Sequence, residues 1–323
     1  MLFSRDPFVI VDGGLSTALE VLGHRSQGLL WTAQMLIEQP EVIVAAHRSF
    51  VEAGAEVIIS ASYQASQAGF MRAGCSVTEA RQLLASTTAL ARASGAGMVA
   101  ASVGPFGATL GDGSEYHGRY EASWSQVRRF HRERLEILVD TGPDLLAIET
   151  IPGHIEAEII LEELEVLGGP PTWLSFSCRD AASTCAGDSF VEVVRSLSGN
   201  HTLLALGVNC TDPNHVTPLL NSAARQTDRP WVVYPNHGQV WDPILEDWAG
   251  QGCAQLVPHL SDWLALGARF IGGCCGIGPD QIRQLKEARG CLRLFDPDPV
   301  GRTGELPCDS KLPTQIFLRT PLS

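Results

Sequence analysis

The chain has 323 residues, of which 45% are hydrophobic and 18% are charged, and its formal net charge is −13. This length allows a large buried core, and no apolar stretch is long enough to span a bilayer, so we expect a globular protein without a membrane partner. No block of basic residues interrupts the acidic composition, which argues against nucleic acid as a partner.

Eight short runs rich in apolar and β-branched residues recur along the chain. They are residues 8–13, 56–63, 97–104, 144–152, 172–178, 202–210, 230–236 and 269–275. Most of these runs are continuously apolar, which is typical of parallel strands that are covered on both faces. We therefore predict eight parallel strands.

Segments with helical spacing lie between these strands. In residues 124–138 the apolar side chains form one stripe, and Arg128, Arg129 and Arg132 fall outside it. Residues 155–167 and 190–197 show a similar pattern. Start signals for later helices are Asp180, Asp188, Asp212-Pro213 and Pro279-Asp280.

Strands that alternate with helices predict a single (β/α)₈ barrel, the TIM barrel, over residues 1–295. Two domains are an alternative at this length, but barrels of this size commonly form one domain. A doubly wound open sheet would require a Gly-x-Gly-x-x-Gly turn after the first strand, and residues 12–17 lack it. Residues 296–323 are rich in Pro, Gly, Asp and Arg, and we expect a C-terminal extension outside the barrel, with the composition of a mobile tail.

Polar and glycine-rich motifs follow seven of the eight predicted strands. They are Asp12-Gly13-Gly14, residues 60–66, residues 104–107, residues 149–152, Asn209-Cys210, residues 234–236 and Cys274-Cys275. In a barrel, the C-terminal ends of all strands meet at one rim, where active sites are built. We therefore predict that the active site lies at this rim.

Nine cysteines, an odd number, are scattered along the chain. A disulfide framework would place an even number at close spacings in a short chain. Residues 1–6 lack the charged, apolar and cleavage regions of a secretory signal. These features favour a reducing compartment, and we expect a cytoplasmic protein.

Two adjacent cysteines lie in a glycine run, Gly272-Gly273-Cys274-Cys275-Gly276. Neighbouring cysteines do not close a relaxed disulfide, because their Cβ vectors point apart. The glycines free the backbone to bring both sulfur atoms toward one point, and a soft ion such as Zn²⁺ prefers thiolate ligands. An isolated cysteine is more often a small buried residue, but a pair between glycines favours a metal site.

Cys210 follows the apolar residues 203–208 and Asn209, so in a barrel it reaches the same rim as Cys274 and Cys275. Three thiolates leave one position of a zinc tetrahedron open, which is typical of a catalytic site. We therefore predict one Zn²⁺ per chain, bound by these three cysteines. A purely structural zinc site would require a fourth protein ligand, and a thiol redox enzyme would favour a Cys-x-x-Cys motif.

The motifs at the strand ends resemble those of the homocysteine S-methyltransferase family, the zinc-dependent methyl-transfer barrels. The matching stretches extend over roughly residues 7–290 and are Asp12-Gly13-Gly14, residues 62–66, Gly104-Pro105, residues 112–116, residues 149–152, residues 207–210, residues 234–236 and residues 272–275. The chain is most similar to the short branch, which uses S-methylmethionine or S-adenosylmethionine as donor. Gly276 departs from that branch, where arginine often follows the cysteine pair, and so does His237-Gly238-Gln239, where Ser-Gly-Glu is more usual.

The resemblance implies a methyltransferase that moves a methyl group from a sulfonium donor to the thiol of L-homocysteine, giving methionine. A betaine-type or methyltetrahydrofolate-type donor is the alternative. A free thiol is mostly protonated at pH 7, and binding to Zn²⁺ removes its proton. The leaving group is a neutral thioether, so no general acid is needed and none has to be found among the residues.

The resemblance also suggests which residues bind the substrates. Glu149 is the preferred candidate for the ammonium group of homocysteine, and Asp12 is the second. Backbone amides at Gly13 and Gly14 are candidates for its carboxylate, and Asn209 is a candidate for orienting the next residue or bonding the substrate. The candidates for binding the sulfonium donor are acidic or aromatic residues, namely Asp112, Glu115, Tyr116 and Trp241. The alternative interpretation is a solvated loop that is acidic without binding a donor.

Overall fold

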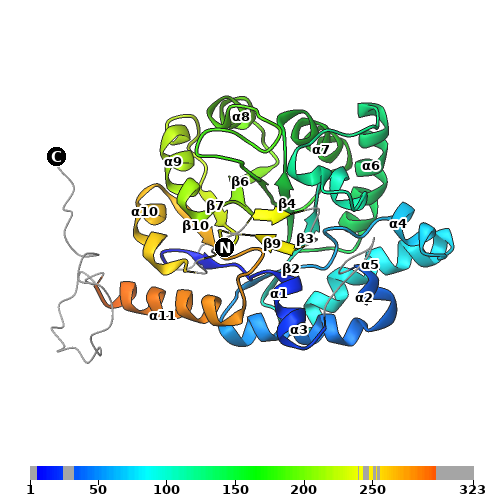
Figure 1. Cartoon of the computed structure of the whole chain (residues 1–323), viewed down its shortest axis with the longest axis horizontal. Coiled ribbons are helices and arrows are strands. Elements are labelled where there is room, and N and C mark those ends of the chain that lie inside the picture. Colours follow the sequence, from blue (N-terminus) through cyan, green and yellow to red (C-terminus); the bar gives the residue numbers. More distant parts are fainter. Residues whose placement is uncertain are drawn as a thin grey trace.

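The computed structural model describes residues 6–24, 33–238, 240–242, 247–249, 252 and 255–295 (Figure 1). The predicted extension, residues 296–323, lies outside the described residues. The side chain of Trp241 also lies outside them. Across the described part of the chain, every helix is too short or too polar to traverse a lipid bilayer.

Eight parallel strands form one sheet that closes on itself. The strands are β1 (Val9–Ile10), β2 (Val57–Ile59), β3 (Met98–Val103), β4 (Leu145–Ile151), β5 (Thr172–Phe176), β6 (Leu203–Asn209), β7 (Trp231–Tyr234) and β10 (Ala268–Ile271). Their order in the sheet is β1-β10-β7-β6-β5-β4-β3-β2. A parallel bridge between Val11 and Val57 joins the two ends of this order. The eight predicted strands and the (β/α)₈ barrel are therefore confirmed.

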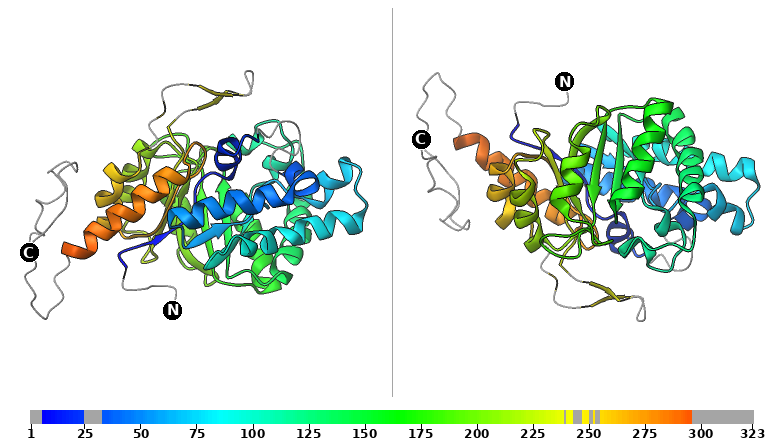
Figure 2. Two further views of the ribbon diagram at one scale, coloured as in Figure 1. Left: turned by 90° about the horizontal axis from the view of Figure 1, so that it is seen from below. Right: turned by 90° about the horizontal axis from the view of Figure 1, so that it is seen from above.

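The helices surround the sheet in both views of Figure 2. They are α1 (Leu15–Val21), α2 (Ala33–Glu38), α3 (Pro40–Ala53), α4 (Gln67–Arg72), α5 (Val77–Ala93), α6 (Trp124–Asp140), α7 (His154–Leu167), α8 (Phe190–Leu197), α9 (Pro213–Ala223), α10 (Leu260–Ala265) and α11 (Pro279–Phe295). Three 3₁₀ turns are η1 (Phe106–Thr109), η2 (Ser114–Tyr116) and η3 (Val257–His259). The predicted helices at residues 124–138, 155–167 and 190–197 correspond to α6, α7 and α8.

Buried side chains form two clusters, one on each face of the sheet. The cluster inside the barrel is built on Trp173, whose ring lies 5.6 Å from that of Phe270 and 6.2 Å from that of Tyr234. The larger cluster packs between the strands and the helices. Since both faces of each strand are covered, the strands need apolar residues at successive positions. The filled interior leaves the ends of the barrel as the place for chemistry.

Helix starts follow local hydrogen-bond rules. Asp212 accepts a hydrogen bond from the backbone N–H of Asn214 at the start of α9, as predicted. The start signal at Asp180 was wrong, because its carboxylate accepts from the N–H groups of Ala182 and Ser183 in a turn and no helix begins there. Asp188 lies directly before Ser189, the residue that precedes α8. The Asp188 carboxylate accepts from the backbone N–H of His154, 2.7 Å away, at the start of α7. A carboxylate can stabilise the N–H groups of any helix start that tertiary packing brings close.

An antiparallel hairpin between β7 and β10 was not predicted. Its strands are β8 (Val240–Asp242) and β9 (Asp247–Ala249), and they form a separate sheet. Both views in Figure 2 show the hairpin apart from the barrel. Trp241, a predicted donor-binding residue, belongs to β8.

Candidate metal centre and active site

Three cysteines meet at the C-terminal rim of the barrel. Cys210 directly follows β6, and Cys274 and Cys275 follow β10. The Sγ atoms of Cys210 and Cys275 are 3.8 Å apart, and those of Cys274 and Cys275 are 4.0 Å apart. All three sulfur atoms lie within 4.8 Å of one another. The structure therefore brings together the three residues that the sequence predicted as metal ligands.

The end of β7 holds the cysteine turns in place, because β7 lies between β6 and β10. The N–H of Cys210 donates to the carbonyl of Tyr234 at 3.1 Å, and the N–H of Cys274 donates to that of Pro235 at 2.8 Å. Cys210 has a φ of +47°, in the left-handed region that non-glycine residues rarely adopt. Such backbone strain persists only where the surroundings enforce it, and it is common at functional sites.

Two glycines allow the close approach on which this arrangement depends. A Cβ atom at Gly207 in β6 would overlap the carbonyl oxygen of Val232 in β7. Gly276 has a φ of +77°, and a Cβ atom there would overlap the ring of His237. Glycine is therefore required at both positions, on either side of the cysteine group. The two departures from the short-branch pattern, at residues 237 and 276, are thus in direct contact.

The three sulfur atoms are joined by hydrogen bonds, and these bonds make the pKa values of the three thiols differ. Hydrogen bonds to Cys274 and Cys275, together with burial, raise the pKa of Cys210 well above its usual value. Hydrogen bonds from Cys210 and Cys274 hold the pKa of Cys275 well below its usual value. Cys275 is therefore the first thiolate of the group. A dication would favour loss of the remaining protons, because thiolates are the ligands it binds.

The group can hold a metal ion and leave one position open. Within the described ranges, it contains no fourth His, Cys, Asp or Glu ligand atom. The sulfur atoms face one another without an intervening protein group, as a shared soft cation requires. This ligand set fits the three-ligand type of centre and not the closed four-ligand type.

Asp12 and Glu149 are buried carboxylic acids at the same rim. The Asp12 Oδ2 atom accepts from the backbone N–H of Ile59 at 2.9 Å, and its Oδ1 atom has no partner among the described residues. Burial raises the pKa of Asp12 well above its usual value, and nearby Glu149 and Cys274 add to this. Burial likewise raises the pKa of Glu149 to about 8, although Ser102 donates a hydrogen bond to its Oε1 atom. Arg134 lowers the pKa of Glu149 without forming an ion pair with it, and buried acids that lack a directly paired cation are typical of a site that binds a positive group.

The backbone amide of Gly14, a candidate for the substrate carboxylate, is hydrogen-bonded within the protein. Its N–H donates to the carbonyl of Ile277 at 2.9 Å, so it is not available to a substrate carboxylate. A Cβ atom at Gly14 would lie 2.7 Å from the carbonyl oxygen of Cys274, and one at Gly13 would overlap that of Ile277. Both glycines therefore permit the first strand to pack against the segment that carries Cys274 and Cys275.

Asn209 is fully buried, and its side-chain amide is engaged within the protein. The Oδ1 atom accepts from the N–H of Thr150 at 2.7 Å and from Ser175 Oγ at 2.8 Å, and Nδ2 donates to Thr150 Oγ1 at 2.7 Å. Thr150 has a φ of +59°, so Asn209 links two residues in the left-handed region, Thr150 and Cys210. Of the two roles expected for Asn209, this network favours orienting the cysteine over bonding the substrate.

The four candidates for donor binding have different environments. Glu115 is 9% exposed, its Oε2 atom has no partner among the described residues, and burial raises its pKa to about 7. Burial raises the pKa of Tyr116, and the charges of the rim cysteines raise it further, so Tyr116 lies within electrostatic range of them. Asp112 is exposed and accepts from the N–H of Ser114, as a turn residue does. The environment of the Trp241 side chain lies outside the described residues.

Two tyrosines at the rim were not among the predicted site residues. Burial and the charges of Glu115, Tyr116 and Cys210 raise the pKa of Tyr63, which follows β2. The hydroxyl of Tyr234 in β7 accepts from Trp173 Nε1 at 3.1 Å. Both tyrosines lie in motifs already identified at strand ends, and a search for phenol groups in these motifs would have found them.

Comparisons with known proteins agree with this arrangement. A family model described as homocysteine S-methyltransferase matches residues 9–289. A homocysteine S-methyltransferase of Escherichia coli (strain K12) is 39% identical over 298 residues, covering 88% of this chain and 96% of the relative. A homocysteine S-methyltransferase 1 of Arabidopsis thaliana is 38% identical, covering 85% and 91%. The crystal structure of the homocysteine methyltransferase MmuM from Escherichia coli in its metallated form is similar with a TM-score of 0.78 and 38% identity, covering 88% and 96%.

Proposed function

We propose that this chain, which belongs to the homocysteine S-methyltransferase family, transfers a methyl group to the sulfur atom of L-homocysteine and so forms methionine. One observation carries the proposal: three cysteine sulfur atoms from β6 and β10 lie within 4.8 Å of one another, with no fourth ligand atom in the group among the described residues. A metal held there retains a position for an incoming thiol.

The ligand set favours Zn²⁺ as the metal, one per chain, held by Cys210, Cys274 and Cys275. When bound, Zn²⁺ would supply a site at which a thiol loses its proton while its sulfur stays nucleophilic. The low pKa of Cys275 supports binding by supplying one thiolate before the metal arrives. The existence of a metallated form of the relative from Escherichia coli also supports a bound metal.

The two buried carboxylic acids would bind the amino-acid part of homocysteine. An ammonium group between Asp12 and Glu149 would be a directly paired cation for both carboxylates, and it would favour their ionised forms. The unpartnered Oδ1 atom of Asp12 supports this role. Thr150 and Asn209 would hold the ends of β4 and β6 in register, so that the carboxylate of Glu149 and the sulfur of Cys210 keep a constant separation.

The methyl donor would be a sulfonium compound, S-methylmethionine or S-adenosylmethionine. In the reaction a bond forms between the homocysteine sulfur and the methyl carbon, and the bond from that carbon to the donor sulfur breaks. The donor leaves as a neutral thioether, and the thiol proton passes to solvent. Glu115 and Tyr116 would stabilise the positive charge of the donor, because an acidic group and an aromatic face both attract a cation.

The proposed substrates are small molecules, and the proposed compartment is the cytoplasm. All seven cysteines that the structure describes are free thiols, namely Cys75, Cys178, Cys185, Cys210, Cys274, Cys275 and Cys291. Free thiols persist in a reducing compartment. We place the catalytic unit in residues 1–295, because the family match ends at residue 289.

The test is a methionine-formation assay on purified protein of measured metal content. We expect about one equivalent of zinc and turnover of homocysteine with S-methylmethionine or S-adenosylmethionine. Betaine and methyltetrahydrofolate serve as alternative donors, and turnover with either one alone would replace the sulfonium proposal. Failure with all four donors on fully metallated protein would contradict the enzymatic function.

A cobalt-substituted sample separates a catalytic centre from a structural one. Homocysteine should change the visible spectrum of the bound Co²⁺, because its thiolate enters the coordination sphere. A spectrum that stays constant at saturating homocysteine would indicate a closed, structural centre. Methionine, which lacks a free thiol, is the matched control ligand.

A further inference from the structure

We propose that Glu156 is a positioning residue that holds the segment 104–120, here called the rim loop, over the cysteine centre. The rim loop follows β3 and carries Glu115 and Tyr116. Glu156 lies on α7, is 1% exposed, and belongs to none of the groups described above. The catalytic part of this inference rests on the proposed function, whereas the structural part does not.

Three hydrogen-bond donors from different elements converge on the Glu156 carboxyl group. Its Oε1 atom accepts from the backbone N–H of Phe106 at 2.6 Å and from His131 Nε2 at 2.8 Å. Its Oε2 atom accepts from the hydroxyl of Tyr120, also at 2.6 Å. Burial lowers the pKa of His131, so its ring is neutral and donates through Nε2. Glu156 therefore fastens the rim loop near both of its ends.

Contact within the rim loop transmits this attachment to the site. A Cβ atom at Gly107 would lie 2.6 Å from the backbone nitrogen of Glu115 and 2.8 Å from the ring of Tyr120. The backbone of η1 is thus packed directly against η2. Since Phe106 begins η1, a shift of Phe106 must displace Glu115 or Tyr116, or open a gap between the two turns.

Aromatic packing makes the attachment specific. The ring of Phe106 meets that of Tyr120 edge to face at 5.3 Å and that of Phe130 at 5.2 Å. Arg134 on α6 donates to the carbonyl of Gly104 at 2.9 Å and so fixes the first residue of the rim loop. The two ends of the rim loop also meet through the Phe106 and Tyr120 rings, and Glu156 adds a carboxyl group that accepts a hydrogen bond from each of these residues. Loss of these bonds would leave three donors without this acceptor, of which His131 is buried and Phe106 and Tyr120 are partly buried, and an unsatisfied buried donor is costly.

A second buried glutamate on α7 provides a matched control. Glu163 is also 1% exposed and lies two helical turns after Glu156. Its carboxylate pairs with Arg128 at 2.9 Å and with Arg132 at 2.5 Å, both on α6. Substitution of Glu163 therefore removes a buried carboxylate from the same helix without removing a hydrogen bond to the rim loop.

The experiment compares Glu156→Ala, Glu156→Gln and Glu163→Ala. Hydrogen exchange followed by mass spectrometry reports on the amides of residues 104–120, and steady-state kinetics report KM and kcat for donor and homocysteine. In Glu156→Ala we expect faster exchange in the rim loop and unchanged exchange in β4 to β6. We also expect kcat/KM for the donor to fall on the order of 10²-fold, since small misplacement of binding groups has effects of that size.

The other variants should behave differently. Glutamine can accept from Phe106 and His131 with its oxygen and donate to the Tyr120 hydroxyl with its nitrogen, so Glu156→Gln should restore slow exchange and most of the activity. Glu163→Ala should leave exchange in the rim loop unchanged. In all three variants the metal content and the homocysteine-induced change of the cobalt spectrum should match those of the unsubstituted protein.

Two results would overturn the inference. The first is slow exchange in residues 104–120 of folded Glu156→Ala, and the second is equal acceleration in Glu156→Ala and Glu163→Ala. If Glu156→Ala does not fold, Tyr120→Phe removes one bond to Glu156 and must accelerate exchange at the C-terminal end of the rim loop. The exchange result stands even if no methyl transfer is found, so failure of the proposed function and failure of this inference are distinguishable.

Discussion

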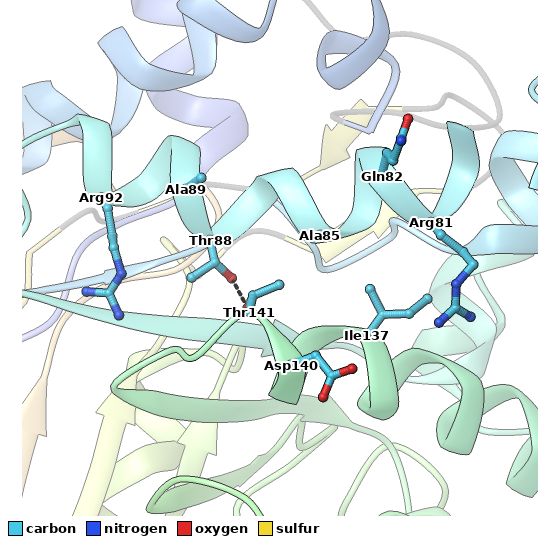
Figure 3. A pocket seen from close by; sticks show the side chains of 9 residues that line it. All are labelled: Arg81, Gln82, Ala85, Thr88, Ala89, Arg92, Ile137, Asp140 and Thr141. Atoms are coloured by element: carbon cyan, nitrogen blue, oxygen red, sulfur yellow. Dashed lines mark hydrogen bonds between the residues drawn. The ribbon is translucent and has the colours of Figure 1, made fainter. Parts of the chain in front are cut away.

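The C-terminal rim of the barrel and the groove between α5 and α6 differ in how their polar groups are satisfied. Those of the rim are buried and partly without hydrogen-bond partners among the described residues, whereas those of the groove are paired or exposed to solvent. The groove has a volume of about 550 Å³ and is lined by Arg81, Gln82, Ala85, Thr88, Ala89, Arg92, Ile137, Asp140 and Thr141 (Figure 3). Its polar groups are paired or exposed: Thr88 and Thr141 are hydrogen-bonded at 2.8 Å, and Arg92 pairs with Asp144 at 3.0 Å. At the rim, Asp12, Glu149 and Glu115 are buried, and atoms of Asp12 and Glu115 lack partners among the described residues.

This difference shows that buried polar groups without partners, and not the volume of a cavity, identify the candidate active site. Burial of a carboxylic acid without a cation lowers the stability of the folded state. A protein retains such a group where a ligand supplies the missing charge. The groove has no comparable cost, so its shape alone gives no reason to expect a ligand. Substitutions at the rim should therefore change function strongly, and those in the groove should not.

The largest effect is expected from Cys275→Ala. This change removes the sulfur with the low pKa and leaves two thiols, which is too few for a stable zinc centre. We expect loss of bound metal and a fall in methionine formation of more than about 10³-fold, as for removal of a principal catalytic group. Metal analysis and the donor assay measure both. Cys75→Ala is the control, because Cys75 belongs to no metal-binding group within the described part of the chain, and equal losses in the two variants would contradict the assignment.

The next largest effect, a loss of stability, is expected from a substitution in β6, the strand that precedes Cys210. Gly207→Ala would force β6 away from β7, because the new Cβ atom overlaps the carbonyl oxygen of Val232. We expect the free energy of unfolding to fall by about 3 kcal/mol or more, since an overpacked core does not relax without backbone movement. Gly199→Ala is the control, because nothing lies within 4 Å of the added atom. Denaturant unfolding compares the two, and a loss below about 0.5 kcal/mol in Gly207→Ala would be incompatible with this packing.

The sequence predicted the strands and the residues at their C-terminal ends far better than the hairpin and the side-chain contacts that surround them. All eight strands were recognisable because each is covered on both faces and needs successive apolar residues, and barrel closure then brings Cys210 to Cys274 across 64 positions. The sequence of the hairpin, residues 240–242 and 247–249, contains no long run of successive apolar residues that would predict a strand. The Glu156 contacts join residues 50, 36 and 25 positions apart through single side chains. No periodicity encodes such contacts, so only the folded structure reveals them.

A smaller effect, with a distinctive pH dependence, is expected for Glu149→Gln in the metal-free protein. The folded-state pKa of Glu149 is about 8, against a usual value of 4.5. Between these values the folded protein keeps a proton that the unfolded chain has released, so the stability of the unsubstituted protein falls as pH rises. Glutamine does not titrate. The stability advantage of the variant should therefore be smallest near pH 4.5 and grow toward pH 8, by up to about 1.4 kcal/mol per pH unit.

Denaturant unfolding at several pH values measures this advantage, and differences between the two proteins cancel the titration of distant groups. The same substitution should weaken homocysteine binding, because the ammonium group loses one of its two carboxylates. A stability difference that is constant with pH would show that Glu149 is ionised in the folded protein across this range. Asp144→Asn is the control, because its carboxylate is partly exposed and already has Arg92 as a partner.

The smallest effect is expected in the groove. Arg92→Ala removes an ion pair with Asp144 and a hydrogen bond to the carbonyl of Gly142, but both side chains of the ion pair are about two-fifths exposed. Water screens such a pair, so the free energy of unfolding should fall by only about 0.2–1 kcal/mol. Methionine formation should stay within about twofold of the unsubstituted protein, because changes at distant sites are usually independent. A larger loss of activity in a variant of normal stability and metal content would show that the groove is coupled to the rim, and the contrast between the two regions would then fail.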